Sequence, residues 1–126
     1  MTRSAQHRVL VGITGGAGTG KSILSHQLCR VLNVLSKQEV AVALSIDGYH
    51  LPNALLDTQV EMEQGREVLL RQIKGLPRTF DVDSLVADLR RLRSSEQQEI
   101  KLPVYDRRRH DPVPGALSVQ PHHRIV

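Results

Sequence analysis

The sequence predicts an α/β fold, a three-layer sandwich in which helices cover both faces of a parallel central sheet. Three observations predict it: an apolar run at residues 9–13, a helix-periodic stretch after a glycine-rich loop, and a second apolar run at residues 40–46. Near-continuous apolar runs are typical of buried parallel strands, and two of them around a helix make a βαβ unit. We therefore expect ligand chemistry at the carboxyl ends of these strands.

The loop after the first run carries the most specific motif of the chain. It reads Gly-Gly-Ala-Gly-Thr-Gly-Lys-Ser and matches the phosphate-binding pattern G-x-x-x-x-G-K-[ST]. Glycines let backbone N–H groups approach phosphate oxygens, and the following helix presents the positive end of its dipole to the same anion. We expect Lys21 to contact the β- and γ-phosphates of a nucleoside triphosphate and the Ser22 hydroxyl to bind Mg²⁺. A glycine-rich turn without a ligand is the alternative. The predicted phosphate site consists of Gly15, Gly16, Ala17, Gly18, Thr19, Gly20, Lys21 and Ser22.

Periodicity and breaker residues predict the other elements. A helix is expected after the loop because apolar residues recur there at helical spacing (Leu24, Leu28, Val31, Leu35). Residues 53–74 are compatible with a helix interrupted by Gly65, and Asp83 is predicted to cap a further helix. Short strands are expected at residues 100–105 and 117–119, and residues 124–126 look like the beginning of another.

Composition excludes several classes of protein. With 126 residues, 40% of them hydrophobic, the chain has room for one domain and no apolar stretch of membrane-spanning length, so we expect a cytoplasmic protein without a membrane partner. Cys29 is the single cysteine and cannot form an internal disulfide. His122 and His123 are expected to point to opposite faces of a strand or to lie in a surface loop, and so to make a poor metal pair.

The net charge of +4 is compatible with nucleic acid, but one Phe, two Tyr and no Trp leave little stacking surface. A basic pocket for a phosphorylated small molecule is the preferred interpretation, with no nucleic-acid partner.

The three aromatic residues each lie within two positions of an aspartate (Asp47 and Tyr49, Phe80 and Asp81, Tyr105 and Asp106). A pocket for a small polar acceptor needs flat apolar walls and a few convergent polar groups, and these segments could supply both. The alternative for each segment is a turn aspartate beside an aromatic side chain that packs in the core.

Four motifs, taken in order, give the chain a family resemblance. They are Gly-Ile-Thr-Gly-Gly-Ala-Gly-Thr-Gly-Lys-Ser at residues 12–22, Asp-Gly-Tyr-His-Leu-Pro-Asn at 47–53, Lys-Gly-Leu-Pro-Arg-Thr-Phe-Asp at 74–81 and Leu-Pro-Val-Tyr-Asp at 102–106. They resemble the superfamily of uridine kinase, phosphoribulokinase and bacterial pantothenate kinase over nearly the whole chain. The stretch at 105–114 is typical of an uncharacterised nucleoside or nucleotide kinase-like subgroup, sometimes labelled fructose transport kinases. The resemblance implies a P-loop NTPase fold and transfer of the γ-phosphoryl group of ATP, with Mg²⁺, to a hydroxyl of a small metabolite such as a nucleoside, sugar or vitamin.

The resemblance also implies roles for individual residues. Lys21 would hold the phosphates, and Asp47 would be the catalytic base facing the acceptor hydroxyl, although a metal ligand or a turn-capping residue stays open for Asp47. Arg107, Arg108 and Arg109 depart from the uridine kinase pattern, and we interpret them either as a solvated loop or as a site for an anionic acceptor group. The acceptor-binding residues expected on these grounds are Tyr49, His50, Phe80, Asp81, Tyr105, Arg107 and His110.

Members of the superfamily continue into a Glu-Gly segment, an arginine-bearing lid and an adenine-contacting region, which have no counterpart in residues 1–126. We therefore expect residues 1–126 to be the N-terminal part of a single P-loop kinase domain, without the lid and the C-terminal strands and with its oligomeric state open. A catalytically incompetent ATP-binding fragment or an NTP hydrolase is the alternative function. A GTPase is excluded because the sequence contains neither Asn-Lys-x-Asp nor Asp-x-x-Gly.

Overall fold

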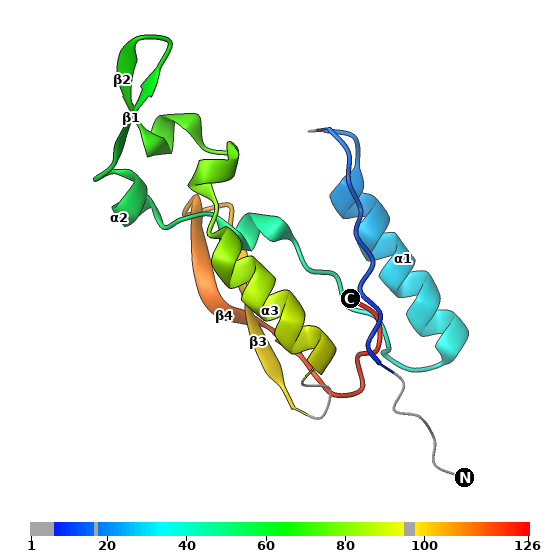
Figure 1. Cartoon of the computed structure of the whole chain (residues 1–126). Helices are drawn as coiled ribbons and strands as arrows, with labels where there is room; N and C mark the ends of the chain where they lie inside the picture. The colour runs from blue at the N-terminus through cyan, green and yellow to red at the C-terminus, as the bar shows by residue number, and fades with distance from the viewer. Residues whose placement is uncertain (1–6, 17, 95–97) are drawn as a thin grey trace. The chain divides into compact units, whose positions relative to one another are not determined.

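The structure, a computed structural model, describes residues 7–16, 18–94 and 98–126 (Figure 1). The chain divides into two compact units. Unit 1 comprises Met1–Leu44, Leu89–Ile100 and Ser118–Val126, and unit 2 comprises Ser45–Asp88 and Lys101–Leu117. Within the described ranges, no helix is both long and apolar enough to cross a membrane.

Helix α1 (Lys21–Ser36) confirms the helix predicted after the glycine loop (Figure 1). The helix ends at Lys37, whose φ of 55° is left-handed and whose N–H donates to carbonyl oxygens of the last turn. The Asn33 side chain then ties the helix to the second apolar run: its Oδ1 accepts the N–H groups of Val40 and Ala41, each at 2.8 Å, and its Nδ2 donates to the Ala41 carbonyl at 3.2 Å. One amide thus satisfies three backbone groups that need partners.

The apolar runs of unit 1 pair only through isolated parallel bridges. Ile125 forms a parallel bridge with Val9 and another with Ala41. Elsewhere in residues 9–13 and 40–46 the described chain forms no strand, and Ile46 begins a 3₁₀ helix instead. A strand ladder needs a partner segment of similar length. The backbone groups of these two runs, however, form their ladder hydrogen bonds only with residues 124–126. The predicted strand lengths are therefore wrong, but the bridges are parallel, as predicted. The three-layer sandwich with a continuous parallel sheet stays a prediction.

The apolar stripe of α1 is formed but not packed. Its four predicted residues are all at least 43% exposed (Leu24, Leu28, Val31, Leu35), and none of the residues of α1 is buried. Cys29 is half-buried, and this burial raises the pKa of its thiol, so the reactive thiolate is a small fraction at neutral pH.

Arg8 is the polar centre of unit 1. Its side chain is only 2% exposed, and it donates from Nε to the carbonyl of His123 at 2.8 Å, from Nη1 to that of Leu92 at 2.6 Å and from Nη2 to that of Gln120 at 3.4 Å. A guanidinium can be buried here because its N–H groups remain hydrogen-bonded. The contacts fasten the amino-terminal segment to residues far along the chain.

His122 and His123 lie at a turn and not in a strand, as the loop alternative expected, but His123 is buried and only His122 is at the surface. Their ring centroids lie 4.4 Å apart. The Nε2 atoms of both rings lie 3.9 Å from the same Glu39 oxygen, which brings three potential metal ligands together. His123 Nδ1, however, accepts the N–H of Gln120 at 2.8 Å. The hydrogen of the neutral ring is therefore on Nε2, the atom that a metal ion would need. In this tautomer the cluster is therefore not arranged to bind a metal ion.

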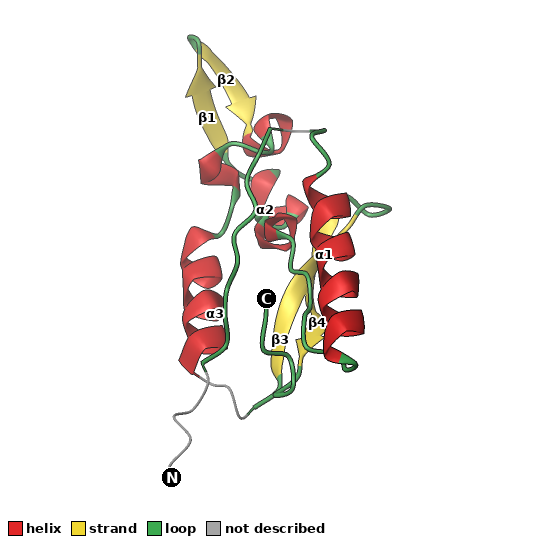
Figure 2. Cartoon of the chain, turned by 90° about the vertical axis from the view of Figure 1, so that its right-hand side faces the viewer, coloured by secondary structure: helices red, strands yellow, loops and turns green. Residues whose placement is uncertain are grey.

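Unit 2 begins with the 3₁₀ turn η1 (Ile46–Tyr49) and the single-turn helix α2 (Asn53–Leu56). The antiparallel hairpin of β1 (Val60–Glu63) and β2 (Arg66–Leu69) follows, and then η2 (Leu70–Ile73) and η3 (Pro77–Thr79) (Figure 2).

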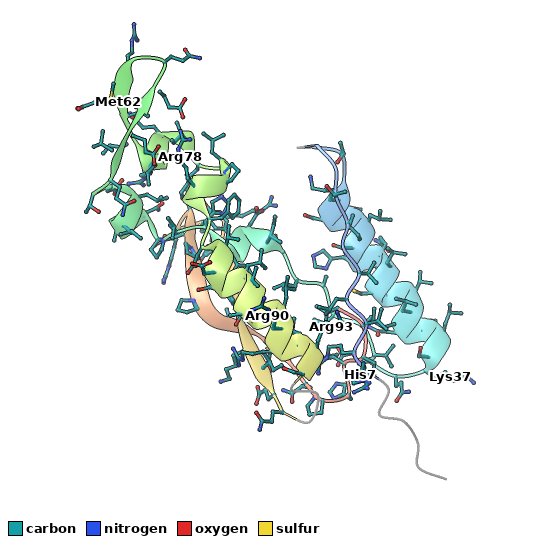
Figure 3. All side chains as sticks on the ribbon, viewed as in Figure 1. His7, Lys37, Met62, Arg78, Arg90 and Arg93 are labelled. Carbon is teal, nitrogen blue, oxygen red and sulfur yellow. The ribbon has the colours of Figure 1, made fainter. Side chains whose placement is uncertain are left out.

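The hairpin overturns the helix expected over residues 53–74, of which only α2 and the short turn η2 are helical. Gln64 and Gly65 have positive φ values of 48° and 79°, which a two-residue hairpin turn requires. Ion pairs between Arg78, labelled in Figure 3, and both glutamates of β1, Glu61 and Glu63, add to the hairpin.

Helix α3 (Val82–Ser94) is followed by the two-stranded sheet of β3 (Ile100–Asp106) and β4 (Asp111–Val119) (Figure 2). The four residues between the strands allow only an antiparallel hairpin. The strand predicted at 100–105 is confirmed, and the one at 117–119 is the end of a longer strand. The predicted cap is wrong by two residues: Asp81, not Asp83, caps α3, because Asp81 Oδ1 accepts the N–H of Ser84 at 3.1 Å and Oδ2 accepts its hydroxyl at 2.6 Å.

Gly48 packs directly against the backbone of β3. A Cβ built at this position would lie 2.5 Å from the carbonyl oxygen of Pro103 and 3.1 Å from the nitrogen of Val104. Only glycine lets η1 approach the strand this closely, and the contact fixes where Asp47 and His50 lie within unit 2.

We expect Gly48→Ala to lower the free energy of unfolding by about 1–3 kcal/mol, because the added methyl group meets backbone atoms that cannot rotate away. Urea denaturation followed by circular dichroism measures the change. Gly12→Ala is the matched control, since nothing lies within 4 Å of its Cβ, and its effect should stay within about 0.5 kcal/mol. Equal losses in the two variants would contradict the packing argument.

The stability of the fold should also depend on pH through His123. Burial, and then the neighbouring His122, lower the pKa of His123 below its ordinary 6.5, against a smaller opposing effect of Glu39. The unfolded chain therefore takes up the proton first, so stability should fall as the pH drops through about 6.5. Urea midpoints measured near pH 7.5 and near pH 5.5, flanking that value, should drop more in the wild type than in His123→Gln. Identical drops would show that this ring does not titrate on unfolding.

Candidate active site

The glycine loop of unit 1 turns at Gly18 and Gly20, whose φ values of 75° and 90° lie in the left-handed region. The Thr19 hydroxyl closes the loop by donating to the Gly16 carbonyl at 2.7 Å. The first N–H groups of α1 have no acceptor within the helix, and its first turn contains no acidic residue. The loop therefore presents a positive helix end that no side chain of this turn neutralises.

Lys21 folds back over this loop. Its Nζ donates to the carbonyl oxygens of Gly15 and Gly16 at 2.7 and 2.8 Å, and none of the described carboxylates pairs with it. The Ser22 hydroxyl is exposed and has no hydrogen-bond partner within the described ranges. An unpaired cation and a free hydroxyl at adjacent positions fit a nucleotide phosphate and Mg²⁺. Ala17, also assigned to the phosphate site, lies outside the described residues.

Asp47 lies in η1 of unit 2 and is held through its backbone. Its N–H donates to Ser45 Oγ at 3.2 Å, and its carbonyl accepts from the N–H and the Nδ1 of His50 at 3.1 and 2.7 Å. Its half-buried carboxylate has no hydrogen-bond or ion-pair partner in the part of the chain that the structure describes. The backbone is thus fixed while the carboxylate is available.

The other aspartates near the aromatic residues are committed. Asp81 caps α3 through Ser84, as described above. Asp106 Oδ1 accepts the N–H of Arg108 at 2.8 Å, and Asp111 Oδ1 accepts the N–H of Asn53 at 2.9 Å. Their oxygens already satisfy backbone donors, so Asp47 is the aspartate of these motifs whose carboxylate remains available to a ligand.

His50 brings two predicted acceptor-binding residues together. Its ring centroid lies 4.1 Å from that of Phe80 and 5.1 Å from that of Tyr105, and we call these three side chains the ring cluster. A carbonyl oxygen can only accept, so the hydrogen bond to Asp47 places the ring hydrogen on Nδ1. In the neutral ring, Nε2 then carries a lone pair that can accept a hydrogen bond from a ligand.

Tyr49 and Asp81 have structural contacts that compete with their expected acceptor roles. Tyr49 is 2% exposed, and its hydroxyl donates to Asp88 Oδ2 at 2.9 Å. Asp81 uses both oxygens in the cap. These placements fit the alternative of a turn aspartate beside a packing aromatic, and the acceptor roles of both residues stay predictions.

The turn between β3 and β4 carries the remaining expected residues. The Arg107 and Arg108 side chains are exposed and have no carboxylate partner among the described residues. His110 is exposed and has a left-handed φ of 52°.

Two residues that the sequence reasoning missed hold this turn. The His110 carbonyl accepts hydrogen bonds from Lys74 Nζ at 2.7 Å and from Asn53 Nδ2 at 2.8 Å. Asn53 Oδ1 is buried and has no partner of its own in the described structure. Their positions gave a signal, because Asn53 ends the Asp-Gly-Tyr-His motif and Lys74 begins the Lys-Gly-Leu-Pro motif.

Comparison with known proteins identifies the chain at the level of family. Residues 10–126 match the family described as phosphoribulokinase / uridine kinase. The chain belongs to this family. The resemblance of its four motifs is thereby confirmed.

Individual relatives in the family act on different molecules according to their names. A candidate uridine kinase of Schizosaccharomyces pombe is 31% identical over 96% of this chain, and a pantothenate kinase of Enterococcus faecalis is 30% identical over 93% of it. The solved structure of a candidate fructose transport system kinase from Silicibacter sp. TM1040 has a TM-score of 0.75 and 30% identity over 99% of this chain. The chain spans 49%, 36% and 54% of these three proteins, about half their length or less. The kinase-family fold is therefore supported, and the relatives' names are those of kinases.

The two possible roles of Asp81 can be separated by substitution. Asp81→Ala should lower the free energy of unfolding by about 1 kcal/mol because it removes the cap, whereas Asp81→Asn should change it by a few tenths only, since asparagine caps equally well. Urea denaturation measures both, with exposed Asp83→Ala as the control. If Asp81→Asn destabilises as much as Asp81→Ala, the cap assignment is wrong; if the folded Asn variant loses acceptor binding, the acceptor role gains support.

Proposed function

We propose that this protein, as a member of its kinase family, transfers the γ-phosphoryl group of ATP to a hydroxyl group of a small metabolite. The observation that carries the proposal is the glycine loop, in which Lys21 is fixed by two carbonyl oxygens and keeps an unpaired charge. Family membership supports the same reaction class. The loop alone is equally compatible with an NTP hydrolase or an ATP-binding protein without activity.

Different residues have different roles in the proposed transfer. The loop N–H groups and Lys21 bind the β- and γ-phosphates and offset the charge that spreads over the transferred group. Ser22 would hold Mg²⁺, which neutralises charge on the phosphate oxygens. Asp47 accepts the proton of the acceptor hydroxyl, and its free carboxylate supports this role. The ring cluster binds and orients the acceptor, with His50 Nε2 accepting a hydrogen bond.

The experiment that tests the function is ADP release from ATP and Mg²⁺ in the presence of sugars, nucleosides and vitamins. Release that depends on an acceptor supports the kinase. Release at the same rate without any acceptor supports an NTP hydrolase, and ATP binding without release in any mixture supports the inactive ATP-binding protein. Either of these last two outcomes overturns the proposal.

We expect Asp47→Asn to reduce turnover by about 10²- to 10⁴-fold, the usual contribution of a positioned base, and to leave ATP affinity within about twofold. Steady-state kinetics and calorimetric titration with ATP measure the two quantities. Asp83→Asn makes the same chemical change at an exposed site and should alter neither, while Lys21→Met should weaken ATP binding itself. Loss of ATP affinity in Asp47→Asn would instead favour the metal-ligand role.

A further inference from the structure

We propose that Lys74 makes this protein selective for an acceptor that carries an anionic group, a carboxylate or a phosphate monoester, in addition to the hydroxyl that is phosphorylated. The inference rests on the proposed function in one respect, because the anion that it describes is the acceptor. Lys74 is a specificity-determining residue in this proposal and takes no part in the transfer itself.

The position of the Lys74 ammonium group is set by two neutral oxygens. Nζ donates to the Tyr105 hydroxyl at 3.1 Å and to the His110 carbonyl at 2.7 Å. It lies 5.3 Å from the centre of the Tyr105 ring, and the hydrogen bond to the hydroxyl indicates that it approaches the ring edge and not its face. Two of its three N–H groups are thereby used, and the third is available to a ligand.

The charge of Lys74 is not neutralised. Two other basic residues of unit 2 do pair with acids: Arg71 lies 3.0 Å from Asp57, and Arg78 pairs with both glutamates of β1. No described carboxylate pairs with Lys74, although it is half-buried. A partly desolvated cation without a counter-ion is screened less by water than an exposed one, so an anion that reaches it gains a stronger charge interaction.

The neighbouring groups add donors and charge. Because Lys74 donates to the Tyr105 oxygen, the hydroxyl hydrogen of Tyr105 points elsewhere, and none of the described groups accepts it. Arg107 and Arg108 lie on the turn that follows Tyr105 and also lack carboxylate partners. An oxyanion at Lys74 would therefore receive one N–H and one O–H, in a field that is positive.

The ring cluster connects this cation to the reacting end of the acceptor. Tyr105 contacts His50, and His50 donates to the backbone of Asp47 while contacting Phe80. The Asp47 turn is thus at one end of this chain of contacts and Lys74 at the other. The arrangement favours an acceptor with a hydroxyl at one end and an anionic group at the other.

The turn itself is held so that this geometry persists. Asn53 binds the same His110 carbonyl as Lys74 and also donates its N–H to Asp111 at 2.9 Å. The carbonyl is thus retained by Asn53 when Lys74 is substituted. Substitution of Lys74 by Gln keeps a hydrogen-bond donor for it and removes only the charge.

The experiment compares two matched pairs of acceptors that differ in one group: pantothenate with its alcohol panthenol, and fructose 6-phosphate with fructose. Calorimetry gives the dissociation constant of each, with Mg²⁺ and a non-hydrolysable ATP analogue present to keep the test anions from the glycine loop. The first pair reports a carboxylate and the second a phosphate. The variants are Lys74→Gln, Lys74→Arg and the control Lys101→Gln, which removes an exposed charge from β3 of the same unit.

The wild type should bind the anionic member of at least one pair more tightly than its neutral partner. Lys74→Gln should weaken the binding of that anionic member by about 10- to 100-fold, as expected for loss of a charged hydrogen bond. The dissociation constant of the neutral member should stay within about twofold of the wild-type value. Lys74→Arg should retain most of the preference, and Lys101→Gln all of it.

Three results would overturn the proposal: a wild type that prefers neither anion, an equal loss for both members of a pair in Lys74→Gln, which would make the lysine merely structural, or the same loss in Lys101→Gln. The failure of the proposed function has a different signature. If no acceptor stimulates ADP release but the anion preference depends on Lys74, the anion site is supported and the proposed kinase activity is refuted.

Discussion

The close approach of Gly48 to the backbone of Pro103 is the constraint on which the candidate acceptor site depends. Any side chain at position 48 would push η1 away from β3. The position of His50 relative to Tyr105, and with it the ring cluster, follows from this contact, because His50 is held by the Asp47 carbonyl and Tyr105 is in the strand. The glycine of the Asp-Gly-Tyr-His motif is therefore needed for packing, whereas the carboxylate of the aspartate before it has no described partner.

Local features were well predicted from the sequence because their causes lie within a few residues. Helix α1 follows from its apolar spacing and the glycine loop from its motif, and both are where the sequence placed them. The β1–β2 hairpin was missed for an equally local reason: a lone Gly65 in a charged, helix-compatible stretch gives the same pattern for an interrupted helix and for a two-residue turn. Val60 pairs with Leu69 across that turn, and this pairing decides between them.

Features that depend on distant partners were predicted less well. The runs at residues 9–13 and 40–46 have the composition of strands, but each can pair only with what lies beside it, and Ile125 supplies a single bridge to each. The aromatic and aspartate pairs show the same limit. Their spacing is alike, yet Asp81 and Asp106 accept backbone N–H groups and Tyr49 donates to Asp88. Only the three-dimensional structure distinguishes the Asp47 carboxylate from those that already have partners.

Two of the lysines without described carboxylate partners, Lys21 and Lys74, are held in place by hydrogen bonds. Exposed cations such as Lys37 and Lys101 lack described carboxylate partners too, but water solvates them at little cost. Lys21 and Lys74 differ because each residue is half-buried and its ammonium group is held by two neutral oxygens. Side-chain freedom has already been lost at both, so an anion that binds there gains the charge interaction without ordering the lysine again. Each site thus offers an anion a cation that is already in place, as the proposed roles of the two lysines require.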